Sequence, residues 1–203
     1  MKRIHFILVT LLAAGGLTLA LIAYVRTHGF SARTEPSAVE AFVARKVRSL
    51  AVPSKAREAM NPVSASPEVL SEAMEHFADH CATCHANDGS GDTVIGKGLS
   101  PKAPDMRLAD TQKLTDGEIY YIIHNGIRFT GMPAFGEDKE GKPDEGSWKL
   151  VHFIRHLPKI TEEEIQAMKK LNPKSQAELA EEEQIRRFLA GEDVPVAPSH
   201  HRH

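Results

Sequence analysis

Both cysteines of the 203-residue chain lie in a single five-residue stretch, Cys81-Ala82-Thr83-Cys84-His85. This placement leaves no cysteine for a disulfide scaffold. A zinc site needs about four ligands, usually with a second Cys or His pair at matching spacing, and the chain has no second C-x-x-C. A thioredoxin-like pair sits at a strand-to-helix turn, whereas an apolar helical pattern precedes this motif. The sequence therefore disfavours all three classes.

The spacing C-x-x-C-H is typical of covalent attachment of a c-type haem. Cys81 and Cys84 can each form a thioether to a haem vinyl group, and His85 can ligate the iron. The motif predicts one covalently attached haem c, and the lack of a second C-x-x-C-H disfavours a dihaem peroxidase. The three residues are the predicted attachment and proximal ligand positions.

The sixth iron ligand is expected among the six methionines of the chain. Met132 lies in a Gly131-Met132-Pro133 loop, where glycine allows close backbone approach and proline stiffens the loop. Most other methionines start the chain, precede the haem region or lie on helical stripes typical of core packing. We therefore predict Met132 as the second iron ligand beside His85, with Met106 as the alternative.

With these residues in place, residues 67–158 resemble a class I cytochrome c of the bacterial, membrane-anchored, single-haem kind. The haem motif lies near the start of this segment, Met132 follows His85 by 47 positions, and a final helical pattern carries Trp148. The resemblance implies an all-α, haem-wrapping domain in which the first and last helices, expected at 67–79 and 147–157, pack together.

The resemblance also implies that a proline carbonyl after the motif accepts a hydrogen bond from the proximal histidine. Pro101 and Pro104 are both placed to do this. Such a bond would orient His85 and raise its basicity.

Two further residues are candidates for contact with the haem propionates. Arg128 lies four residues before Met132 and could form a charge-assisted contact, or it is an exposed loop residue. Trp148, the only tryptophan, could donate its indole N–H, or it is a half-buried aromatic residue at a helix start.

Local signals agree with an all-α domain. Ser66 followed by proline is a helix start, and a Thr115-to-Glu118 capping box opens another helix that Gly126 closes. Between the motif and that helix, glycines, prolines and turn residues predict an irregular loop over residues 87–104. A loop this long is accounted for if it wraps a flat cofactor.

The N-terminal segment contains twenty residues without a charge, Phe6 to Val25, preceded by Lys2 and Arg3. Twenty helical residues rise about 30 Å, enough to cross a bilayer core. A cleaved signal peptide is the alternative, but apolar residues continue past the weak cleavage candidate at Ala20. We predict a single-pass anchor over residues 1–26 in the cytoplasmic (inner) membrane, with the haem domain on the periplasmic side.

Charge divides the rest of the chain. Residues 1–66 carry a net charge of +6, residues 67–158 a net charge of −6 and residues 159–203 a net charge of −2. The total of −2 gives no reason to expect nucleic-acid binding. The acidic haem domain predicts redox partner proteins with a basic docking patch.

Two segments flank the haem domain. The linker 27–66 contains an amphipathic helical pattern over residues 38–51 with several basic residues, which we expect to pack on the domain or to be solvated; the alternative is contact with anionic lipid. Residues 159–203 contain two capped helices, which could dock on the domain or on a partner, and a disordered histidine-containing tail.

The sequence therefore predicts an electron carrier rather than an enzyme, transferring one electron through a His/Met-ligated haem c. Two alternatives remain open. The chain could be the cytochrome subunit of a larger dehydrogenase or oxidase complex. It could also bind or sense a small ligand at a five-coordinate haem, if Met132 is displaced.

Overall fold

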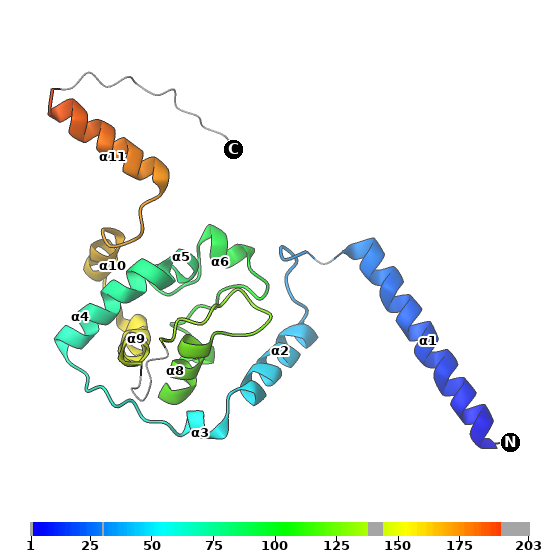
Figure 1. Cartoon of the computed structure of the whole chain (residues 1–203). Coiled ribbons are helices and arrows are strands. Elements are labelled where there is room, and N and C mark those ends of the chain that lie inside the picture. The colour runs from blue at the N-terminus through cyan, green and yellow to red at the C-terminus, as the bar shows by residue number, and fades with distance from the viewer. Residues whose placement is uncertain (1, 30, 138–143, 192–203) are drawn as a thin grey trace.

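The computed structural model describes residues 2–29, 31–137 and 144–191, and its regular elements in these ranges are helices without strands. Figure 1 shows a compact group of helices from which α1 (Lys2–His28) projects toward the N-terminus and α11 (Gln176–Leu189) toward the C-terminus. The N-terminal helix α1 (Lys2–His28) has 27 residues and none of them is buried. Among the described residues it is the helix that is long and apolar enough to cross a membrane.

The core forms where the first and last helices of the haem domain meet. Helix α4 (Pro67–His76) packs against α9 (Glu145–His156). The rings of Phe77 and Phe153 are 4.9 Å apart and both side chains are fully buried. The expected pairing of these two helices is therefore present.

The helix that leads to the haem motif is longer than predicted. After α4 the chain continues through a π-helical turn, η1 (Phe77–Cys81), and then α5 (Ala82–His85). The predicted end at Asp79 is therefore wrong, because the π turn carries the helix directly into the motif. Ala86 ends it with a φ of +60°.

Helix α8 (Asp116–Asn125) begins and ends as predicted. Thr115 accepts from the backbone N–H of Glu118, whose carboxylate accepts from the N–H of Thr115. Gly126 caps the other end with a φ of +65°. The ring of Tyr120 stacks on Trp148 at 4.1 Å, which joins α8 to α9.

The segment after the motif is more regular than expected. The helical turn α6 (Val94–Gly98) interrupts the predicted irregular loop, and a second turn, α7 (Ala109–Gln112), follows it. The Thr93 side chain caps α6 by accepting from the N–H of Gly96. This capping provides local hydrogen bonds that glycine-rich composition alone does not reveal.

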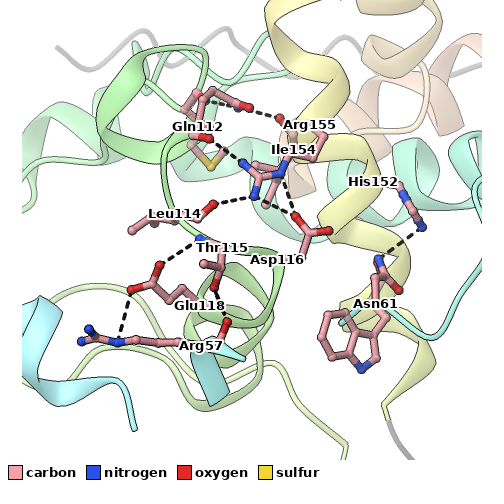
Figure 2. Close-up of polar contacts among 12 residues, drawn as sticks. Arg57, Asn61, Gln112, Leu114, Thr115, Asp116, Glu118, His152, Ile154 and Arg155 are labelled. Atoms are coloured by element: carbon pink, nitrogen blue, oxygen red, sulfur yellow. Dashed lines mark hydrogen bonds and ion pairs between the residues drawn. The ribbon is translucent and has the colours of Figure 1, made fainter. Parts of the chain in front are cut away.

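The linker before the haem domain is partly built into it. Helix α3 (Ser54–Arg57) packs on α8 so closely that a Cβ at Gly117 would lie 1.9 Å from the Ala56 carbonyl oxygen. The Thr115 hydroxyl donates to the Arg57 carbonyl at 2.9 Å, and Arg57 pairs with Glu118 at 3.5 Å (Figure 2). The packed unit therefore starts ahead of residue 67.

Helix α2 (Ala38–Ala51) precedes this contact, and its apolar stripe is exposed rather than packed on the domain. Its capping box is formed by Ser37 and Glu40.

A polar cluster around Arg155 fixes the other side of α8 (Figure 2). The guanidinium donates to the carbonyl oxygens of Gln112 and Leu114 and to the carboxylate of Asp116, at 2.5 to 2.9 Å. Asn61 donates from the linker to the Trp148 carbonyl at 2.9 Å. These contacts join three segments that are distant in sequence.

The two helices after residue 158 behave differently. Met168 in α10 (Glu162–Lys169) is fully buried, and the His156 ring lies 2.9 Å from the Glu164 carboxylate. Helix α10 therefore packs on the haem domain, whereas α11 (Gln176–Leu189) buries no residue. The predicted tail, including the terminal histidines, lies outside the described residues.

Candidate functional site

The haem motif lies at the end of the α4–η1–α5 helix. Cys81 is the last residue of the π turn, and Cys84 and His85 lie in the following helical turn. Both cysteines are free thiols and both are partly buried. Two free thiols three positions apart, beside a histidine, match the arrangement expected for thioether attachment.

The protonation of Cys81 argues against a thiol redox centre. Burial, together with the neighbouring Cys84, raises the pKa of Cys81 to about 12. Redox-active and nucleophilic cysteines instead have lowered pKa values, because the thiolate is the reactive form. In this fold Cys81 is a protonated thiol at neutral pH.

His85 provides the clearest sign of a missing partner. Its Nδ1 is buried and makes no hydrogen bond within the described residues. Burial lowers the pKa of the His85 ring, and the Pro104 carbonyl opposes part of that shift. The ring is therefore neutral at physiological pH, which is the form that ligates a metal.

Of the two proline candidates, the structure brings Pro104 to His85. The Pro104 carbonyl raises the pKa of the His85 ring, against the effect of burial. Gly91 holds the adjoining backbone close to the motif. A Cβ at Gly91 would lie 2.5 Å from the carbonyl oxygen of Ala103, and Gly91 also donates its N–H to the His85 carbonyl at 2.8 Å. No comparable contact joins Pro101 to His85 among the residues described.

Two residues that the sequence did not single out hold the backbone of Cys84. The Thr93 hydroxyl donates to the Cys84 carbonyl at 3.2 Å. A Cβ at Gly96 would lie 2.2 Å from the same carbonyl oxygen, so this position has no room for a side chain. In the sequence, the spacing of Thr93 and Gly96 indicates a helix cap. It does not indicate that both residues lie against the backbone of Cys84.

The Met132 loop is held by its own hydrogen bonds. The Met132 N–H donates to the Thr130 hydroxyl at 3.1 Å, and its carbonyl accepts from the Ile127 N–H at 3.1 Å. A Cβ at Gly126 would lie 2.6 Å from the Pro133 carbonyl carbon, so the loop closes tightly on the end of α8. The backbone of Met132 is therefore fixed, while its side chain is half-buried.

The same loop lies against the segment that surrounds His85. A Cβ at Gly131 would lie 2.5 Å from a methyl carbon of Leu99, the residue that follows α6. In Figure 1 the loops that follow α6 and α8 lie side by side. Met106, the alternative ligand, is buried in the hydrophobic core with Phe77.

The two candidate propionate contacts differ in environment. Arg128 is exposed on the Met132 loop. Trp148 is 5% exposed and stacks on Tyr120, so it is more deeply buried than the alternative of a half-buried aromatic residue describes.

The donor set fits a covalently held haem better than a metal ion alone. Within the described ranges no group of three or more His, Cys, Asp or Glu side chains is arranged to hold a metal ion, which disfavours zinc. The chain instead offers two free thiols, a neutral histidine whose buried Nδ1 makes no hydrogen bond, and a thioether on an adjacent loop.

Comparison with known proteins agrees with this arrangement. Residues 68–154 match the family model described as "Cytochrome C oxidase, cbb3-type, subunit III". No curated protein matches the chain significantly.

Proposed function

Because residues 68–154 of this chain are a c-type cytochrome domain, which carries covalently bound haem c and transfers electrons, we propose that the protein is a membrane-anchored one-electron carrier with His85 and Met132 as iron ligands. The observation that carries the proposal is the buried, neutral His85 beside two free thiols. The resemblance inferred from the sequence is confirmed at the level of the domain.

In this proposal Cys81 and Cys84 hold the haem through thioethers. His85 would ligate the iron, and the nearby Pro104 carbonyl would help to orient the ring. Thr93 and Gly96 fix the Cys84 backbone and so hold the second attachment point. When bound, the haem supplies an iron centre that cycles between ferric and ferrous states.

Met132 supplies the second ligand. Two features support it over Met106: its backbone is fixed at both N–H and carbonyl, and its loop lies against the segment around His85. A thioether ligand favours ferrous iron and raises the reduction potential. With both His85 and Met132 bound to it, the iron would have no open position for a substrate, which favours electron transfer over ligand sensing.

Helix α1 is consistent with a single-pass membrane anchor. Lys2 and Arg3 at its N-terminal end favour retention of that end in the cytoplasm. The haem domain would then lie on the periplasmic face of the inner membrane.

An acidic haem domain would select a basic redox partner. We expect the haem-loaded full chain in detergent to exchange electrons with a small basic redox protein in stopped-flow mixing. The rate should fall about tenfold or more between about 10 mM and 200 mM salt, because screening removes the electrostatic steering. An acidic redox protein of matched potential is the control, and its rate should rise or stay level with salt. A rate of electron exchange with the basic protein that does not change with salt contradicts the acidic docking surface. The absence of any electron exchange contradicts a carrier role.

The family match favours a second candidate, the cytochrome subunit of a terminal oxidase. The fully buried Met168 shows that α10 belongs to the domain, but α11 remains available to a partner. Recovery of further membrane subunits with the chain after extraction in mild detergent would favour this candidate.

A further inference from the structure

Helix α2 carries an apolar stripe that no part of the described protein covers. Each of its large apolar side chains is about half exposed or more: Val39, Phe42, Val43, Val47 and Leu50. Their spacing places all five on one side of a helix. A solvent-exposed apolar stripe of this size indicates that this side of α2 binds a partner or a membrane.

The stripe lies on the more exposed side of α2. At about 100° per residue, Ala41 and Arg48 lie on the side of α2 opposite the stripe. These two are the least exposed residues of the helix. The polar side of α2 is therefore its less exposed side, and the apolar side is open to solvent.

Basic residues accompany the stripe. Apart from Arg48 on the opposite side, α2 carries the cations Arg45 and Lys46 against a single acidic residue, Glu40, in its 14 residues. The Lys46 ammonium lies 5.8 Å from the centroid of the Phe42 ring, so a cation sits at the margin of the apolar surface. This combination of an apolar face and flanking cations is complementary to an anionic lipid surface.

The chain also keeps α2 near the membrane. Only nine residues separate the end of α1 at His28 from the start of α2 at Ala38. Fully extended, they reach about 30 to 35 Å. On its other side α2 leads directly into buried Val52 and α3, which are packed on the haem domain.

We infer that α2 lies flat in the headgroup region of an anionic membrane, with its apolar stripe in the acyl boundary and its opposite side supporting the haem domain. This inference rests on the proposed anchoring by α1. Helix α11 provides the contrast within the same chain. It also exposes Ile185 and Phe188, but it carries Glu178 and the run Glu181 to Glu183, which an anionic surface repels.

Hydrogen–deuterium exchange of the haem-loaded full chain tests the inference. The protein is placed in lipid nanodiscs of phosphatidylcholine alone or with phosphatidylglycerol. We expect peptides covering residues 38–51 to exchange about tenfold more slowly in the anionic discs, because each cation near an anionic surface adds several-fold to the affinity. The effect should shrink at high salt. Peptides from α11 should exchange equally in both discs.

The charge-reversal variant R45E/K46E should lose the difference, whereas the control K169E/K170E, at exposed positions at the end of α10, should keep it. Equal exchange of residues 38–51 in both discs overturns the inference. Slow exchange that is the same in both discs and in detergent overturns it too, and indicates protein packing. Slow exchange that depends on the number of copies per disc indicates a second chain as the occupant and likewise overturns it. If α1 is not an anchor, the chain fails to enter the discs at all, so that failure is distinguishable.

Discussion

Replacing Met132 with alanine is expected to remove the weak red absorption band of ferric, methionine-ligated haem. The reduction potential should fall by on the order of 0.2 V, because axial ligands shift haem potentials within a range of about 0.8 V. The open sixth position should also allow the ferrous protein to bind carbon monoxide. Optical spectra with and without carbon monoxide, and a redox titration, measure all three effects.

The matched control is Met106→Leu, which conserves volume at the buried alternative ligand. It should keep the red band and the potential of the wild type. An unchanged red band in Met132→Ala, or its loss in Met106→Leu, contradicts the assignment of Met132.

Replacing both Cys81 and Cys84 with serine is expected to abolish covalent haem. Serine is close in size to cysteine but cannot form a thioether. After expression with haem-maturation machinery, the wild-type polypeptide should carry haem stain through a denaturing gel and the double variant should carry none. Each single variant retains one thioether and should stain, at a lower yield.

Thr93→Ser is the control for this series, because it keeps the hydroxyl that donates to the Cys84 carbonyl. It should stain as strongly as the wild type. Haem stain that persists in the double serine variant contradicts attachment through this motif, since the chain has no other cysteine.

Local features of the site were predictable from the sequence because they are encoded within a few residues. The C-x-x-C-H motif and the Gly131-Met132-Pro133 loop each need only neighbouring positions. The capping box predicted at Thr115 is present, and the two capped helices predicted after residue 158 begin with capping boxes at Thr161 and Ser175. Such caps form between residues three apart.

Features that depend on tertiary contact could not be read in the same way. Gly96 and Gly117 look like ordinary turn and helix residues, yet each leaves room for a carbonyl oxygen from another segment. Arg155 joins α9 to the start of α8 through two backbone carbonyls. Every residue has a backbone carbonyl, so neither composition nor motif spacing predicts these contacts.

The helix boundaries likewise combine features that the sequence predicted with features that depend on the structure. A π turn carries the first helix past Asp79 into the motif, although the sequence predicted its end there. Periodicity detects which residues share a helical face but not a single wider turn, because one added residue shifts the stripe by less than a third of a turn. The apolar stripe of α2 was visible in the sequence, whereas its outward direction required the structure.

A spectroelectrochemical titration of the full chain tests the central claim most directly. The account predicts a reversible one-electron transition, with about 59 mV per tenfold change in the ratio of oxidised to reduced protein. The red band should be present in the ferric state, disappear in step with reduction, and carbon monoxide should not bind the ferrous wild type. A ferric spectrum without the red band, together with carbon monoxide binding to the ferrous wild type, would contradict a His85/Met132-ligated electron carrier and indicate an open haem.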